Sequence, residues 1–285
     1  MPIIGTWLAS GTGGADPHSP LTTDENGRWK LDNVPAGVDT QVRVKLRHSD
    51  YVDDRVWGGL QNDQGISMDE FRDGSAVIVM SRGVRLLGLV VDAATGKPVK
   101  DAVVVRGDYP YMETGSQEVR TNEKGLYELP PLPFGKLRVT AIAPGYAPAM
   151  KEIEISGELA RRRLRLDASF RLKPGHRVRI RFTDDGRPVP GVYVGVDRWR
   201  GARSLYNNRH PNVINTKIPL RANSDGIYEW NWAPEDEVFF TFEKSGYEVE
   251  SFEGLKGEPD GKARPGSYRL IPRDEPYEVE LRKAA

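Results

Sequence analysis

The sequence predicts an all-β protein made of three tandem antiparallel β-sandwiches, the first of them incomplete. Three observations predict it. A similar segment occurs three times at spacings close to the size of a domain, charged and apolar residues alternate within each copy, and no stretch has the apolar periodicity of a convincing helix. The chain has 285 residues, and its 30 Gly and 21 Pro indicate many turns but a folded chain.

The recurring segment has a polar run, a glycine, and then alternating aromatic, charged and apolar residues. Its copies read TDENGRWKLDNVPAG, TNEKGLYELPPLPFG and ANSDGIYEWNWAPED, with their glycines at Gly27, Gly125 and Gly226. The glycines lie about 100 residues apart, which is the length of a whole domain. We therefore expect three domains, at residues 1–82, 83–171 and 172–285, which we call the first, second and third repeats.

Each copy predicts a β-hairpin. Asp or Asn followed by Gly supplies the turn, and a half-buried strand follows it. The aromatic residues of that strand are expected in the cores: Trp29, Tyr127, Tyr228, Trp230 and Trp232. After a Pro-rich corner, the next strands are predicted at Val42–Leu46, Leu137–Ile142 and Val238–Phe242.

The second and third repeats also share an opening of strand, turn and strand, with the turns at Thr95–Pro98 and Asp185–Pro188. The first repeat lacks this opening, because Met1–Trp7 leaves room for at most one strand. It is therefore either truncated or completed by a neighbour or a second chain, since an incomplete sandwich exposes an edge. The sequence also leaves open the alternative of a short helical turn at Glu158–Arg162.

The stretch GLVVDAATGKPVKDAVV, followed by TNEKGLYELPPLPFGKLRVTAIAPGYAP, resembles the carboxypeptidase regulatory-like domain, an Ig-like, prealbumin-like (transthyretin-like) β-sandwich grouped with Cna-B-type modules. The resemblance covers Gly83–Ile155 strongly, Leu172–Leu281 with insertions and Thr22–Arg82 in part. It implies tandem modules of a bacterial, planctomycete-type multidomain protein, outside the cytoplasm, that act as spacers, in adhesion or as carbohydrate-binding-like modules. It implies no shared catalytic residue and no cofactor.

Composition excludes several classes of function. The 41 basic and 41 acidic residues balance, which argues against a nucleic-acid partner, and the absence of Cys excludes a disulfide framework, a thiolate zinc site and a Cys nucleophile. The apolar runs are too short to span a membrane, and the N-terminus shows no signal-peptide pattern. We expect no catalytic residue, no metal site and no enzymatic activity.

The best candidate for binding is an insertion in the third repeat, Asp197–Arg221, which has six basic residues and one acid. Aromatic rings stack on the C–H groups of sugars, and Arg binds carboxylate or sulfate groups in a bidentate manner. The candidate ligand-binding residues are Trp199, Arg200, Arg203, Tyr206 and His210. The pattern predicts an anionic glycan or another protein as partner. The alternative is that Trp199 packs on its own sandwich under the Arg side chains, or that the insertion packs on the neighbouring repeat.

The predicted function is that of a non-catalytic extracytoplasmic spacer, adhesion or ligand-binding module. Two alternatives stay open. One is a hydrolase acting on polysaccharide, either as its catalytic or its accessory region, which would need two carboxylates in a cleft beside Trp199. The other is an assembly module whose first repeat is completed by a strand from another chain.

Overall fold

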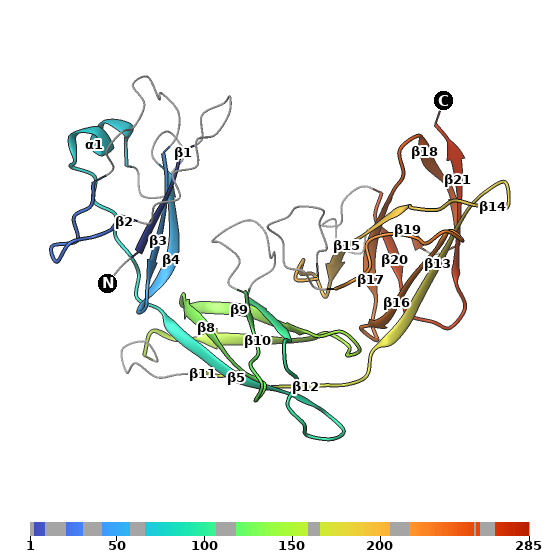
Figure 1. Ribbon diagram of the computed structural model, residues 1–285, viewed down its shortest axis with the longest axis horizontal. Helices are drawn as coiled ribbons and strands as arrows, with labels where there is room; N and C mark the ends of the chain where they lie inside the picture. The colour runs from blue at the N-terminus through green and yellow to red at the C-terminus, as the bar shows by residue number, and fades with distance from the viewer. Residues whose placement is uncertain are drawn as a thin grey trace.

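The computed structural model describes residues 3–8, 21–30, 42–57, 66–106, 118–158, 166–205, 217–253, 255–256 and 266–284, and the structural statements below concern these residues. Their regular secondary structure is almost entirely β-strand, in several sheets that follow one another along the chain (Figure 1). This confirms the predicted all-β class.

The first repeat holds one antiparallel sheet of four strands. Its order is β2 (Leu21–Thr22), β1 (Ile3–Leu8), β3 (Val42–His48) and β4 (Tyr51–Trp57). The layer against Leu46 comes from helix α1 (Met68–Asp73) and the segments before and after it, through apolar side chains: Ile66, Phe71, Ala76, Ile78 and Met80. Among the described residues, a helix and an extended segment thus stand where a sandwich would have its second sheet.

Helix α1 is a correction to the sequence analysis, which found no convincing helix. The Ser67 hydroxyl accepts a hydrogen bond from the Glu70 amide at 3.2 Å, and the Glu70 carboxylate accepts one from the Ser67 amide at 2.6 Å. Gly74 ends the helix in the left-handed conformation, with φ of 79°. The sequence signal was therefore the capping box from Ser67 to Glu70, because a helix of six residues is too short to show a periodic apolar face.

The second repeat has two sheets. One has the order β10 (Ala149–Ile155), β9 (Gly135–Ile142), β6 (Val103–Arg106) and β7 (Glu118–Arg120). In the other, β5 (Val84–Asp92) pairs with β8 (Leu126–Leu132), and it also pairs with β11 (Leu166–Asp167) and β12 (Phe170–Leu172), which follow one another along β5. One apolar cluster lies between the sheets and includes Leu86, Val104, Leu129 and Phe170.

The third repeat repeats this plan. One sheet has the order β14 (Arg187–Pro188), β13 (His176–Asp184), β21 (Tyr277–Lys283) and β18 (Tyr247–Phe252), with β16 (Ile227–Ala233) also paired to β13. The other has the order β15 (Tyr193–Trp199), β17 (Val238–Glu243), β20 (Tyr268–Leu270) and β19 (Leu255–Lys256).

The predicted turn is the same in all three repeats. In each, one side-chain oxygen accepts two backbone N–H groups at 2.8–3.1 Å, from the residues two and four positions later; the acceptors are Asp24, Asn122 and Asn223. The glycines that follow have φ of 75°, 71° and 70°, a region that L side chains rarely adopt. The predicted strands Leu137–Ile142 and Val238–Phe242 lie within β9 and β17, and Val42–Leu46 lies within β3.

The aromatic residues expected in the cores are buried. Tyr127, Tyr228, Trp230 and Trp232 are at most 8% exposed. Trp29 is partly buried against the cluster of the first repeat. The alternation of apolar and charged residues therefore identified the inward face of β8 and β16 correctly. In the first repeat, the described residues after the turn, Arg28–Lys30, do not form a strand, so the strand predicted around Trp29 is not confirmed.

The sheets of the second and third repeats are not purely antiparallel, which is a second correction. β5 runs parallel to both β11 and β12, and β13 runs parallel to β21. The first and last strands of each repeat are therefore neighbours that point the same way. Nothing in the alternation could reveal this, because a strand with one buried face has the same pattern whichever way its neighbour runs.

Candidate functional site

The insertion of the third repeat begins with a tight hairpin. Trp199 and Ala202 exchange both backbone hydrogen bonds, at 2.8 and 2.9 Å, so that only Arg200 and Gly201 form the loop. Both loop residues have positive φ, 49° and 70°. This is the geometry of a two-residue turn whose twist matches that of the strands. The hairpin reverses the chain at once after β15.

A β-bulge at Asp197 decides which side chains of β15 turn inward. The pairing of β15 with β17 shifts register between Val196 and Arg198, so Asp197 is the extra residue. Its carboxylate is 1% exposed and accepts a hydrogen bond from the Arg203 guanidinium at 2.5 Å. The Arg198 guanidinium lies 3.9 Å from the other carboxylate oxygen. The insertion is thus tied to β15 by a buried ion pair.

Trp199 lies on the inner side of the same strand and is 1% exposed. Its indole N–H donates to the Asp236 carboxylate at 2.6 Å, and the other oxygen of Asp236 accepts from the Arg200 guanidinium at 2.6 Å. The Arg200 guanidinium also lies 5.0 Å from the centre of the Trp199 ring, within range of a cation–π contact. One carboxylate therefore holds the tryptophan and the arginine that covers it.

These contacts bear directly on the predicted binding residues. Trp199 does not present a face to solvent, which corrects the expectation of a stacking platform, and the alternative of a packed Trp199 covered by Arg is what the contacts show. Arg200 is nearly half exposed, whereas Arg203 is mostly buried against Asp197. Tyr206 and His210 lie outside the described residues.

The basic residues of the insertion that the structure describes are engaged within the protein. Arg198, Arg200 and Arg203 face carboxylates, and Arg221 donates to the Gly191 carbonyl oxygen at 2.9 Å. Part of the insertion's positive charge is therefore neutralised by ion pairs within the protein. Within the described ranges, no group of three His, Asp or Glu side chains is placed to hold a metal ion.

The insertion sits at a junction between the second and third repeats. On β6, Val104 points into the core of the second repeat, while Val103 and Val105 belong to the apolar cluster of the third repeat. On β9, Ala141 belongs to the core of the second repeat and Ile142 to the apolar cluster of the third repeat. The part of this sheet formed by β6 and the end of β9 is thus buried on both faces, between its own core and the third repeat.

Residues on either side of the insertion's undescribed part also belong to this junction. Leu205 and Ile218 are buried in the same cluster as Val103 and Trp199. A Cβ atom at Gly201 would lie 3.9 Å from the Arg138 guanidinium of β9. The alternative reading that the insertion packs on the neighbouring repeat is therefore what the described contacts show.

The link between the two repeats is short and is held by backbone hydrogen bonds. Only three residues separate β12 from β13, and Ala147 N donates to the Lys173 carbonyl at 2.9 Å while Gly175 N donates to the Gly145 carbonyl at 3.3 Å. Gly175 is so close to β16 that a Cβ there would lie 2.2 Å from the Cα of Trp232. The link has little room to bend.

The sequence offered packing of the insertion on the neighbouring repeat only as an alternative and did not predict the part that β6 and β9 play in it, although a signal was present. Ala102–Val105 is a continuous apolar run, which indicates a strand buried on both faces rather than on one. The run of buried residues at the end of β9, Val139–Ile142, carries the same signal. Neither run says what covers the second face.

Comparison with solved structures finds similarity at low scores. The Bacillus anthracis TIE protein is 18% identical, with a TM-score of 0.26, and the match covers 98% of this chain and 46% of that one. A streptococcal ancillary pilin is 12% identical, with a TM-score of 0.30 and coverage of 100% and 92%. The 5-hydroxyisourate hydrolase of Klebsiella pneumoniae is 21% identical, with a TM-score of 0.26 and coverage of 32% and 91%. Scores this low carry no weight for function.

This chain spans less than half the length of the Bacillus anthracis TIE protein. No curated protein matches it. None of the described helices is long and apolar enough to cross a membrane. The family model of the carboxypeptidase regulatory-like domain matches residues 85–168, which lie in the second repeat and overlap the segment whose sequence resembles that family.

Proposed function

We propose that the chain is a non-catalytic spacer or adhesion module of an extracytoplasmic, surface-exposed protein, in which the second and third repeats act as one rigid unit. The observation that carries the proposal is the burial of β6 and the end of β9 on both faces of their sheet. Three apolar side chains of the second repeat belong to the apolar cluster of the third repeat and not to the core of their own: Val103, Val105 and Ile142. Apolar contact of this kind resists bending, because any tilt between the repeats would expose these side chains to water.

The enzymatic alternative has less support. The carboxylates beside Trp199 are Asp197 and Asp236, and each is held by an arginine, at 2.5 and 2.6 Å. A pair of acids for glycoside hydrolysis needs one that is protonated or free to attack. Acids paired with arginine favour a role in holding the insertion in place.

The rigid unit can be tested by distance measurement between spin labels, because the chain has no native Cys. Glu154→Cys and Asp225→Cys place one label on each repeat, at exposed positions. Double electron–electron resonance on the full chain should give one narrow distance distribution. A broad distribution in the otherwise unaltered chain would refute the proposal.

Two neighbouring residues supply a matched control. Val103→Glu puts a charge into the contact between the repeats, and should broaden the distribution while the second repeat stays folded. Val104→Glu puts the same charge, one residue on, into the core of the second repeat and should unfold it. Circular dichroism separates the two outcomes.

Binding of an anionic glycan is the finer form of this proposal, and the exposed Arg200 is the described side chain that supports it. A glycan array with sulfated and uronate polymers, run on the unaltered chain and on Arg200→Ala, tests it. Binding that weakens with salt and in the variant would support a glycan site on the insertion. No binding by either protein would leave the spacer function without a ligand.

A further inference from the structure

The first and last strands of the second and third repeats form parallel neighbours. In the second repeat, β5 pairs with β11 at Leu86 and Leu87 and with β12 at Val90–Asp92. In the third repeat, β13 pairs with β21 from Ile180 to Thr183. The chain therefore enters each repeat at one end of the pair and leaves it at the opposite end (Figure 1).

This arrangement determines how a pulling force reaches the hydrogen bonds. When the two chain ends are drawn apart, parallel neighbours slide along each other, and the bonds between them are loaded together. If force were instead applied to two strand ends that lie side by side, the bonds would open one after another. A ladder loaded in shear breaks at a higher force, because several bonds must fail in one step. Forced unfolding follows the barrier to that step rather than the equilibrium stability.

The pair of the second repeat is interrupted between β11 and β12, and side chains bridge the gap. The Ser169 hydroxyl accepts the Leu89 amide at 3.0 Å. The Tyr127 hydroxyl donates to the Ala168 carbonyl at 2.6 Å, and the Lys151 ammonium donates to the Ser169 carbonyl at 2.6 Å. Within the gap, the last segment is therefore bonded to β5 through Ser169 and the Ala168 amide, and to β8 and β10 through Tyr127 and Lys151.

The pair of the third repeat carries its own side-chain bonds across the two strands. Arg181 on β13 pairs with Glu278 on β21 at 3.0 Å. Glu280 accepts the Thr183 hydroxyl and the Asp185 amide, both at 2.5 Å. Each of these bonds lies between strands that slide when the chain ends are pulled, so each adds to the resistance.

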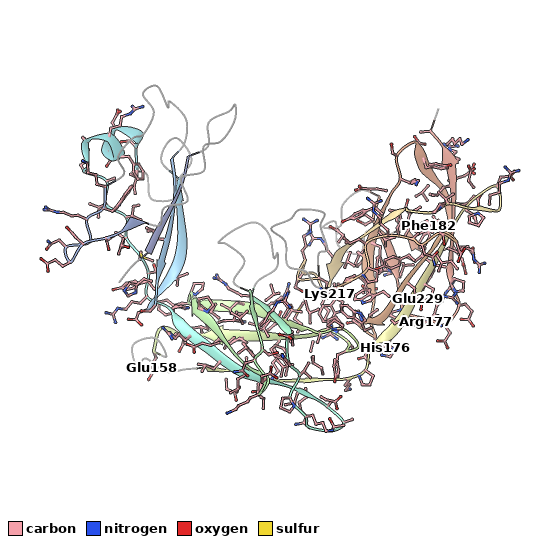
Figure 2. All side chains as sticks on the ribbon, viewed as in Figure 1. Glu158, His176, Arg177, Phe182, Lys217 and Glu229 are labelled. Atoms are coloured by element: carbon pink, nitrogen blue, oxygen red, sulfur yellow. The ribbon has the colours of Figure 1, made fainter. Side chains whose placement is uncertain are left out.

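Arg177 and Glu229 extend this ion-pair network to the antiparallel side of β13. Figure 2 shows both side chains where β13 and β16 lie together, and their charged groups are 3.0 Å apart. β13 is therefore held by side-chain pairs to both of its long neighbours.

We propose that the second and third repeats transmit mechanical tension along the chain, each through a shear clamp formed by its first and last strands. The proposal rests on the spacer function, because only a module held at both ends experiences such a force. The clamp itself is β5 with β11 and β12 in the second repeat, and β13 with β21 in the third.

The test uses optical tweezers on the full chain, with DNA handles attached to introduced cysteines. His176→Cys with Lys283→Cys pulls the third repeat in shear. His176→Cys with Asp274→Cys shares the first handle but pulls from the same end of the pair, because the neighbouring Arg273 amide donates to the Arg177 carbonyl at 3.1 Å. All three positions are exposed.

Both handle pairs should release roughly 100 residues, or about 350 Å of chain, which identifies the same unfolding event. At equal loading rate, the shear pair should break at a severalfold higher force than the peeling pair. Equal forces, or a higher force for the peeling pair, would overturn the proposal.

A second variant tests the side-chain part of the clamp. Thr183→Val removes the hydroxyl that bonds to Glu280, and should lower the shear force more than the peeling force. An equal loss of unfolding force for the shear pair and the peeling pair would mean that this bond contributes only to general stability. Failure of the clamp is distinguishable from failure of the spacer function, since a narrow spin-label distance with equal forces would reject only the clamp.

Discussion

Replacing Gly175 with Ala should damage the link between the second and third repeats more than its single methyl group suggests. The added Cβ would lie 2.2 Å from the Cα of Trp232 and 2.6 Å from its carbonyl carbon. The φ angle of Gly175 lies outside the left-handed region, so the cost is steric and not conformational. Both clashing atoms belong to the backbone of β16, and no rotation of a side chain relieves them.

The magnitude follows from how far the link must move. Carbon atoms in contact lie about 3.5–4.0 Å apart, so the link must retreat by roughly 1.5 Å. Overpacking of this kind costs about 1–3 kcal/mol. The retreat also strains the bond from Gly175 N to the Gly145 carbonyl, which contributes about 1 kcal/mol. We expect a total loss of roughly 2–4 kcal/mol in the free energy of unfolding.

Differential scanning calorimetry measures this loss, and Gly157→Ala is the matched control. A Cβ at Gly157 meets nothing within 4 Å. We expect the transition that includes the second and third repeats to fall by roughly 4–15 °C in Gly175→Ala, and Gly157→Ala to leave it nearly unchanged. The spin-label distance between the repeats should broaden as well. Equal melting of the two variants, with a narrow distance in both, would refute the inferred close approach.

Three further predictions concern the third repeat. Trp199→Ala should lower the free energy of unfolding by about 3–5 kcal/mol, measured by urea titration; a folded, equally stable variant would contradict the burial of this ring. Asp197→Asn should cost about 3 kcal/mol, because Arg203 loses its carboxylate inside the protein, and replacing Arg203 as well should recover part of the loss. Burial, followed by the nearby Tyr193, raises the pKa of Tyr228 above its ordinary value of 10.0. The unfolded chain therefore loses this proton first, so stability should fall as the pH rises beyond about 10, and absorbance at 295 nm should show this phenol ionising only on unfolding.

Much of the fold follows from local chemistry that the sequence displays. The three turns need an Asp or Asn acceptor and a glycine with positive φ, and both are written in each copy of the repeated segment. The inward aromatic residues follow from the two-residue period of a strand. Helix α1 was missed because its only signal is the capping box at Ser67, which a search for apolar periodicity overlooks.

The candidate site was predictable only in part. The pairing of Trp199 with a covering arginine was one of the alternative interpretations of the insertion, and the contact between Trp199 and Arg200 matches it. The acids that hold this pair could not be named in advance. Asp197 turns inward only because a bulge shifts its strand by one residue, and Asp236 arrives from a different hairpin.

The sequence by itself therefore determined the three turns, the strands that follow two of them and the buried face of those two strands, because these depend on residues that are close together in the chain. Tertiary structure alone decided the direction of the terminal strand pairs and the partner that covers the second face of Val103–Val105. Both depend on residues some 80 to 100 positions apart, and a strand buried on both faces has the same composition whatever lies against it.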